Sequence, residues 1–295
     1  MRALIVISAT LLSAGRAMGH GVEAHGSGAY WTFDPWVIAP LALFGILYGV
    51  GFLRLRARSS QPRMLTLSAC SFFCGWLVLV IALVSPLHFL GEHLFTLHMV
   101  EHELVMTLSA PLIVLARPIG VLFWGMPRWL RIGLMRILKA TPVELGWDLM
   151  TAGIAATMAH GAAIWIWHLP PLFDATVSDV ALHRLQHLSF FITGVVFWWA
   201  IIWKAGKGAG AWYLFITMMH TSILGALITV SPRVLYISQT LNAPDWGLTP
   251  LEDQQLAGIV MWVPGGVIYA AAGLALLAKL ITSSRKERRC ASLYS

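Results

Sequence analysis

The hydrophobic pattern divides the chain into long apolar segments that are separated by short polar connections. Seven of these segments each contain about the 20 residues that a helix needs to cross roughly 30 Å of hydrocarbon. They cover Trp36–Leu53, Met64–Val84, Leu94–Ala116, Leu149–Trp167, His183–Trp203, Ala211–Val230 and Leu256–Ile281. The pattern therefore predicts an all-α, polytopic membrane protein with seven transmembrane helices.

The basic residues alternate between the connections, which provides a test of the number of spans. Arginines or lysines follow the first, third, fifth and seventh apolar segments, whereas only Arg184 and Arg233 fall on the opposite side. Because loops rich in Lys and Arg stay in the cytoplasm, this alternation places the N-terminus outside and the C-terminus in the cytoplasm. The connection after the third segment contains an amphipathic basic stretch, residues 128–139, which we expect to lie along the membrane surface.

The two ends of the chain differ from the apolar middle. Residues 1–19 combine Arg2, a short apolar run and a group of small residues, which predicts a secretory signal peptide, with an uncleaved anchor as the alternative. Residues 20–35 would then form an exported segment. Residues 36–282 form one seven-helix transmembrane domain, and residues 283–295 form a basic cytoplasmic tail.

The composition supports the same class of protein. With 58% hydrophobic and 11% charged residues and a mean hydropathy of +0.75, the chain is too apolar for a soluble domain. The net charge of +7 lies in alternate connections and in the tail, so it indicates topology and contact with membrane lipid, not nucleic-acid binding. Cys70 and Cys74 lie on the second span, where we expect them to be buried small residues, and no exported pair predicts a disulfide.

Histidines inside the spans are the main candidates for chemistry. An imidazole in hydrocarbon is costly unless it is paired or ligated. The helical rise places five of them at about the same depth, in the half of the bilayer that faces away from the cytoplasm: His98, His102, His160, His187 and His220. His98 and His102 lie four residues apart, as do His183 and His187, and such pairs can bind one ion together.

We therefore predict a metal site that opens outward. Met106 and Met261 lie near the histidine layer as further ligands, and His183 and Asp253 are placed to guide ions at its mouth. Imidazole suits several transition metals, and the thioethers favour copper slightly. Glu101, three residues from His98, is expected to accept a hydrogen bond from the free N–H of that histidine.

Two alternatives stay open at this point. Two histidines from facing helices can bind a haem axially, and four glycines on these spans would make room for it: Gly153, Gly161, Gly194 and Gly225. In the other alternative, each histidine forms a hydrogen bond with a neighbouring helix and only stabilises the bundle. We find no set of nucleophile, base and orienting group, so we do not expect an enzyme.

Several motifs resemble the polytopic CtaG family of cytochrome c oxidase assembly factors. They are His98-Met99-Val100-Glu101-His102, Trp167-His168-Leu169-Pro170, His183 with His187, His220-Thr221-Ser222 and Asp253-Gln254-Gln255 with Met261-Trp262-Val263-Pro264-Gly265-Gly266. The resemblance implies a multi-pass protein of the bacterial inner membrane that supplies copper to haem–copper oxidases, with oxidase subunits as partners. It also leaves room for a purely structural chaperone. Glu103 departs from the family pattern, in which apolar residues follow the second histidine. The sequence does not indicate the oligomeric state.

Overall fold

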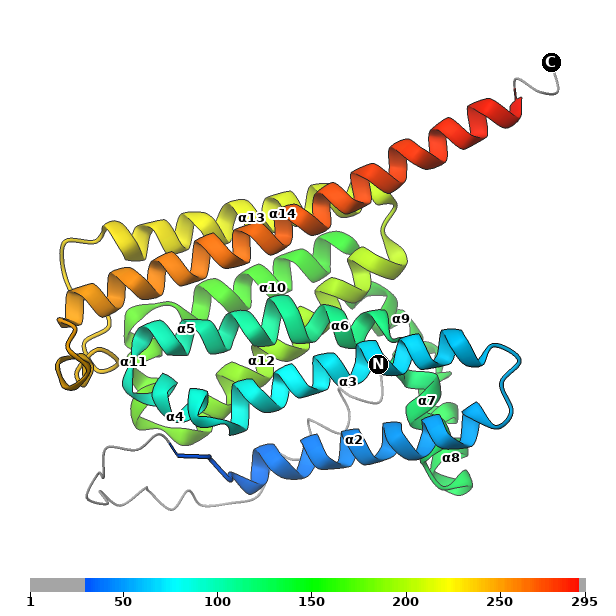
Figure 1. The fold of residues 1–295 in the computed structure, drawn as a ribbon, viewed down its shortest axis with the longest axis horizontal. Helices are drawn as coiled ribbons and strands as arrows, with labels where there is room; N and C mark the ends of the chain where they lie inside the picture. The colour runs from blue at the N-terminus through cyan, green and yellow to red at the C-terminus, as the bar shows by residue number, and fades with distance from the viewer. Residues whose placement is uncertain (1–29, 292–295) are drawn as a thin grey trace.

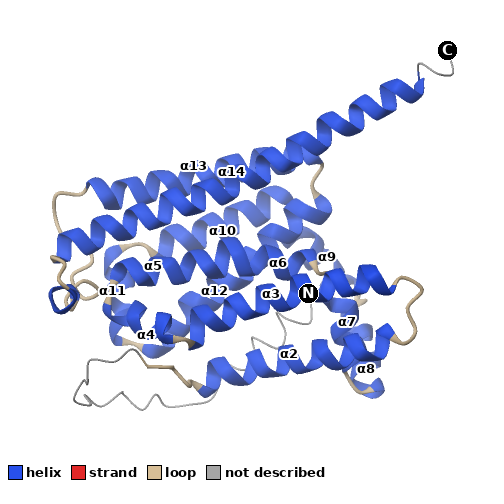
Figure 2. Cartoon of the chain, viewed as in Figure 1, coloured by secondary structure: helices blue, strands red, loops and turns tan. Residues whose placement is uncertain are grey.

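The computed structural model describes residues 30–291, with side chains described up to residue 283. Within this range the chain forms helices joined by short loops, and no strand is present (Figure 2). The predicted signal peptide and residues 20–29 lie outside the described part of the chain.

In chain order the elements are α2 (Pro35–Arg56), α3 (Pro62–Val84), α4 (Pro86–His93), α5 (Phe95–Glu103), η1 (Leu104–Ser109), α6 (Ala110–Leu115), α7 (Pro118–Gly125), α8 (Arg128–Leu138), α9 (Thr141–Met150), α10 (Gly153–Trp167), α11 (Pro170–Ser178), α12 (Val180–Trp199), η2 (Ala200–Lys204), α13 (Lys207–Val230), η3 (Ala243–Trp246) and α14 (Pro250–Ala291).

Five helices are long and apolar enough to cross a membrane: α2, α3, α12 with η2, α13, and α14 as far as Ser283. Two bent pairs raise the number to as many as seven. Residues Phe95–Leu115 and α7 meet at 72°, and α9 and α10 meet at 69°. The all-helical, multi-pass prediction is confirmed, and the predicted seven spans are the upper end of the range that the structure supports.

The first bend has a local cause. Arg117 adopts a left-handed backbone with φ of 47°, and Pro118 follows it, so the helix cannot continue in its original direction. The Arg117 guanidinium lies 3.5 Å from the centroid of the Trp203 ring, a cation–π contact that stabilises the turn.

The helix that carries His98 and His102 widens into the π-helical segment η1 directly after Glu103. Pro111 lacks a backbone N–H, and a wider turn before it relieves the steric conflict of its ring with the preceding carbonyl groups. The carbonyl of Met106 accepts a hydrogen bond from Trp198 Nε1 at 2.9 Å, so a buried polar group of this segment is satisfied by α12.

The helices pack closely along the bundle. Gly225 on α13 and Gly258 on α14 lie at the contact of these neighbouring helices, where a Cβ on Gly258 would meet the Gly225 carbonyl oxygen at 2.6 Å (Figure 1). Such close approach of two backbones is typical of membrane helices. Figure 1 shows α4 and α11 at one end of the bundle and α7, α8 and α9 at the other.

The short helix α4 was not expected from the apolar pattern, which treats residues 85–93 as a connection. The Ser85 side chain caps its first turn by accepting a hydrogen bond from Leu87 N, and Pro86 occupies the first helical position. Gly91 lets α4 lie against α5, because a Cβ there would meet Glu101 Oε2 at 2.8 Å and the His98 backbone at 3.3 Å. This contact positions the site described next.

Candidate metal centre

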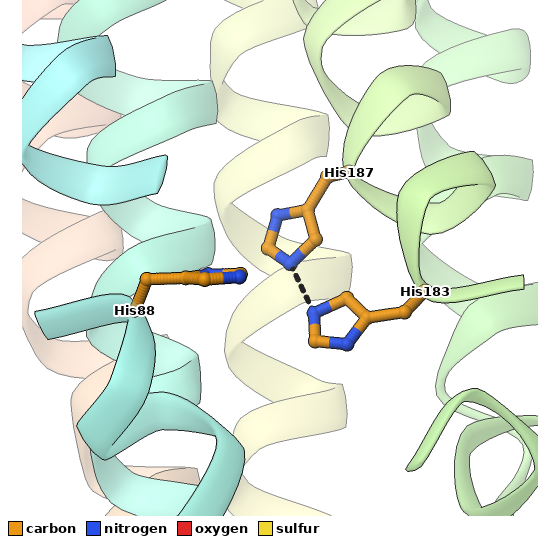
Figure 3. Close-up of side chains that lie close together, drawn as sticks. All are labelled: His88, His183 and His187. Atoms are coloured by element: carbon orange, nitrogen blue, oxygen red, sulfur yellow. Dashed lines mark hydrogen bonds between the residues drawn. The ribbon is translucent and has the colours of Figure 1, made fainter. Parts of the chain in front are cut away.

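Five histidines from three helices gather near the end of the bundle that α4 and α11 form. His88 comes from α4, His98 and His102 from α5, and His183 and His187 from α12. Figure 3 shows His88 approaching from one side and the two α12 histidines from the other, with their rings directed toward one another. The i, i+4 pairs place two rings each on one face of α5 and of α12, as the sequence predicts.

The five histidines form two groups of three that share His187. The outer group is His88, His183 and His187, and the inner group is His98, His102 and His187. In each group one potential ligand atom per residue lies within 4.8 Å of the other two. Nitrogens that bind one zinc or copper ion at about 2.0–2.1 Å lie roughly 3.5 Å apart, so modest side-chain rotations would bring either group into coordination.

The inner group carries buried nitrogen atoms that have no hydrogen-bond partner. Both ring nitrogens of His98, both of His102 and Nδ1 of His187 are in this state. All three side chains are buried, and His98 and His102 are each only 1% exposed. Buried polar atoms are nearly always paired, because leaving one unpaired costs about 1–3 kcal/mol. The unpaired imidazole nitrogens gathered at one point are a group that could hold a metal ion, which accepts lone pairs.

The outer group is more exposed, and each of its histidines has one ring nitrogen in a hydrogen bond. His183 Nε2 and His187 Nε2 lie 2.8 Å apart and share a hydrogen bond. His88 Nδ1 donates to Glu101 Oε1 at 2.6 Å, and the Glu101 side chain is fully buried. Glu101 thus pairs with His88 and not with His98, the partner expected from their spacing along α5. A carboxylate that holds one ring nitrogen commonly orients the other nitrogen of a metal-binding histidine.

The same contact determines the protonation of His88. Burial by itself lowers the pKa of His88, but the charge of Glu101 and the hydrogen bond to it outweigh that effect and raise the pKa to about 9. In the metal-free protein His88 is therefore protonated at neutral pH and donates to Glu101.

His168 is a further histidine that the sequence placed at the membrane surface. It is only 3% exposed, and its ring centroid lies 6.1 Å from that of His102. Its Nδ1 bonds the carbonyl of Ile164 at 2.7 Å, and its Nε2 has no partner. Burial lowers the pKa of His168 to about 4, so the ring is neutral at physiological pH. A donor Nδ1–H leaves the Nε2 lone pair free, which is the form that binds metals.

Two predicted ligands, His160 and His220, belong to neither group. His160 Nδ1 lies 3.1 Å from Thr193 Oγ1, its Nε2 lies 3.5 Å from the Tyr269 hydroxyl, and its ring stacks on Phe197. His220 Nδ1 accepts a hydrogen bond from Trp165 Nε1 at 3.4 Å. Equal depth along different helices did not imply a common direction. For these two histidines the structure matches the alternative in which the imidazole contacts a neighbouring helix.

The other predicted residues lie close to the cluster in different roles. Met106 and Met261 are buried in one hydrophobic cluster with Phe95 and Phe173, and neither belongs to the two histidine groups. Asp253 is fully buried and caps α5 from a distant helix. Its carboxylate accepts hydrogen bonds from Phe95 N at 2.8 Å and Thr96 N at 2.9 Å, and from Thr96 Oγ1 at 2.7 Å. These contacts account for Asp253 without an ion at the mouth of the site.

The glycines that were expected to make room for a haem are in contact with neighbouring helices. A Cβ on Gly153 would meet the Tyr213 ring at 2.3 Å, one on Gly161 would meet His220 at 3.2 Å, and one on Gly225 would meet Trp262 at 2.8 Å. At Gly194 the nearest atoms, at 3.6–3.8 Å, belong to Ala110, His160 and Met106. At three of these positions the glycine thus allows a neighbouring side chain to approach closely, which is the helix-packing use of glycine.

The cysteines also differ from expectation. Cys70 and Cys74 are exposed at the surface of the bundle, not buried within it. The i, i+4 spacing places both on one face of α3, and that face points away from the neighbouring helices.

The sequence did not assign His88, a member of the outer group, or His168, which lies beside His102 of the inner group. The Ser85-Pro86 pair before His88 is a helix-start signal, which could have placed His88 one turn into a short helix. His168 ends α10 directly before Leu169 and Pro170, and no local signal distinguishes a buried helix end from an exposed one.

A helical, multi-pass membrane bundle with a buried histidine cluster defines the class of protein. The chain belongs to the cytochrome c oxidase caa3 assembly factor family (Caa3_CtaG), whose model matches residues 46–283. The matched range includes all five histidines of the two groups. This is a family of assembly factors and is not known as a family of enzymes.

The chain is also similar to larger mycobacterial proteins. An uncharacterized protein of Mycobacterium bovis is 26% identical over 277 residues, which cover 89% of this chain and 40% of the relative. An uncharacterized protein of Mycobacterium leprae is 25% identical over 294 residues, covering 90% of this chain and 42% of the relative. The chain thus spans about two fifths of the length of these curated relatives. No solved structure matches the chain.

Proposed function

We propose that this protein binds a copper ion in its histidine cluster and supplies it to a cytochrome c oxidase during assembly in the bacterial inner membrane. The observation that carries the proposal is the group of unpaired, buried nitrogens on His98, His102 and His187. Membership of an oxidase assembly family supplies the recipient.

The charge around the cluster favours a monovalent ion. The three inner ligands are imidazoles, which bind metals in the neutral form, and Glu101 is the buried carboxylate in contact with them. Glu92, whose side chain is 41% exposed, lies 4.0 Å from His88 Nε2 of the outer group. A buried charge is costly unless it is compensated, so Cu(I) leaves less uncompensated charge here than a divalent ion. Imidazole is a suitable ligand for copper.

Metal analysis of the purified protein tests this proposal. The full chain is loaded with Cu(I) under anaerobic conditions, passed through a desalting column and analysed for copper per chain. We expect about one ion in the wild type and less than a tenth of that in His98→Ala/His102→Ala, because two of three inner ligands are lost. His220→Ala is the control, since His220 lies outside both groups, and it should retain copper.

Three results would contradict the proposal. Copper content that is unchanged in the double variant would remove the cluster as the binding site. A strong Soret band in the protein as isolated from cells would favour the haem alternative. In cells, the double variant should fail to restore oxidase activity to a strain that lacks the protein. Full restoration would instead support a structural chaperone.

A further inference from the structure

The two histidine groups are joined through one residue. His187 belongs to both groups, with ring centroids 4.7 Å from His183 on the outer side and 5.0 Å from His102 on the inner side. We infer that the groups are two successive positions for a single ion, and that His187 remains bound to the ion while its other ligands are exchanged. This inference rests on the proposed metal binding and adds a direction and a path to it.

The geometry favours one ion at a time. The rings of His98 and His183 are 5.3 Å apart by their centroids, so the outer and inner positions are separated by little more than one imidazole. Two cations at that distance in a poorly solvated interior repel each other strongly. Glu101, the buried carboxylate in contact with the cluster, offsets only one positive charge. An ion that occupies one position therefore excludes a second ion from the other.

The order of the two positions follows from burial. His88 and His183 are partly exposed, whereas all three inner ligands are buried. An ion that arrives from the aqueous phase meets the outer group first. An ion held by the inner group is reached only by way of His187 or by opening of the helices.

The hydrogen bonds give the two positions different affinities. The groups differ in the ligands that they do not share: Nε2 of His183 in the outer group shares a hydrogen bond, whereas His98 and His102 in the inner group have no bond to lose. Breaking protein hydrogen bonds lowers the net gain from coordination. The outer position is therefore the weaker one and serves for exchange, and the inner position holds the ion.

The transfer itself is a ligand exchange without a redox step. The ion releases the nitrogens of His88 and His183 and gains those of His98 and His102, while His187 keeps it within the cluster. When the ion binds, His88 releases the proton that it carries in the metal-free protein. Every ligand then donates a lone pair as a neutral imidazole, so the oxidation state of the ion does not change. Release toward a recipient follows the same path in reverse.

Copper exchange kinetics on the full chain test this relay. Three variants separate its parts: His88→Ala/His183→Ala removes the outer position, His98→Ala/His102→Ala removes the inner position, and His187→Ala removes the shared ligand. Cu(I) is the probe, and a water-soluble chromogenic Cu(I) chelator reports both uptake and removal. His93→Ala, on the same short helix as His88 but outside both groups, is the control.

We expect the outer variant to reach about one copper per chain but to load and unload at least tenfold more slowly than the wild type. The inner variant should bind copper at equilibrium at least tenfold more weakly and lose it to the chelator within the mixing time. His187→Ala removes a ligand from both positions, so it should show both defects, slow loading and weak equilibrium binding. The control should match the wild type in both rates.

Three outcomes would overturn the relay and leave metal binding intact. An outer variant that loads at the wild-type rate shows that ions reach the inner group by another route. Complete loss of equilibrium binding in both double variants shows one composite site. Two coppers per wild-type chain would also overturn it. Unchanged copper in every variant would instead contradict the proposed function, so the two failures are distinguishable.

Discussion

Glu101 connects the two histidine groups through contacts of a single side chain. It accepts from His88 Nδ1 at 2.6 Å and lies 3.7 Å from His187 Nε2, although it is fully buried on α5. An unpaired carboxylate would be costly in this environment. Its position shows why the acidic residue is tolerated between two histidines of a membrane helix: it holds one imidazole in place and compensates positive charge in the cluster.

The His88–Glu101 pair predicts a pH dependence of stability in the metal-free protein. Because the folded pKa of His88, about 9, exceeds the unfolded value of about 6.5, the stabilisation is fully present below pH 6.5 and is lost as the pH rises through 9. The shift corresponds to at most roughly 3 kcal/mol. Thermal unfolding in detergent should therefore occur at lower temperature at pH 10 than at pH 7, and Glu101→Gln should reduce this difference.

Wild type and Glu101→Gln are compared over the same pH range without metal, because only their difference isolates this pair. An equal loss of stability in both proteins between pH 7 and 10 would show that other groups cause it.

At the scale of elements, α5 depends on a residue that lies 158 positions away. Asp253, in the first turn of α14, accepts hydrogen bonds from the backbone N–H groups that open α5. Negative charge at a helix N-terminus is favourable, and here it also satisfies buried donors. The contact joins the two helices and determines where α5 begins, and therefore where His98 and His102 lie.

Replacing Asp253 by Ala should destabilise the protein by about 2–4 kcal/mol, because two backbone donors lose their partner in a buried setting. The displacement of α5 should also reduce copper retention at the inner group. Thermal unfolding and copper content measure the two effects. Glu252→Gln is a matched control at the neighbouring position, where the carboxylate is exposed and contacts only Thr249, and it should change neither quantity noticeably. Equal effects of both variants would contradict the capping role.

The π-helical segment η1 is a second element-scale feature with a structural consequence. It starts at Leu104, two residues after His102. The indole N–H of Trp198 on α12 donates a hydrogen bond to one of its carbonyl groups. Wider turns leave carbonyl groups that need external donors. The indole of Trp198 thus holds α12 against this helix at a position further along α12 than His187. The two histidine-bearing helices are therefore linked away from the site as well as at it.

At the scale of the whole molecule, the basic helix α8 and the histidine cluster lie at opposite ends of the bundle (Figure 1). The basic helix α8 lies with α7 and α9 at one end, and the histidine cluster lies near α4 at the other (Figure 1). Positively charged loops stay in the cytoplasm. The predicted orientation therefore places the cluster near the exported face, where an ion can enter from outside.

Reporter fusions test this orientation. Alkaline phosphatase, which is active only after export, should be active when fused after Asn242 in the loop between α13 and α14. Green fluorescent protein fused to the C-terminus should fluoresce, because that end is expected in the cytoplasm. The exchanged fusions are the controls. Phosphatase activity at the C-terminus together with none at Asn242 would show the opposite orientation and exclude ion entry from the exported side.

The sequence by itself determined the class of fold and the local geometry of the histidine pairs. Apolar segments of about 20 residues predict membrane helices, because backbone N–H and C=O groups can enter hydrocarbon only when they are hydrogen-bonded to each other. The i, i+4 spacing of His98 with His102, and of His183 with His187, places each pair on one helical face, since that geometry depends only on the helix itself.

Only the tertiary structure decided which faces meet. It brought His88 to Glu101 through a short helix, buried His168 beside His102, and turned His160 and His220 toward other partners. The depth of a residue follows from its position along one helix. Its direction depends on the rotation and tilt of that helix against neighbours distant in the chain, which packing sets and periodicity does not. For the same reason, Asp253 is a ligand candidate in the sequence and a helix cap in the fold.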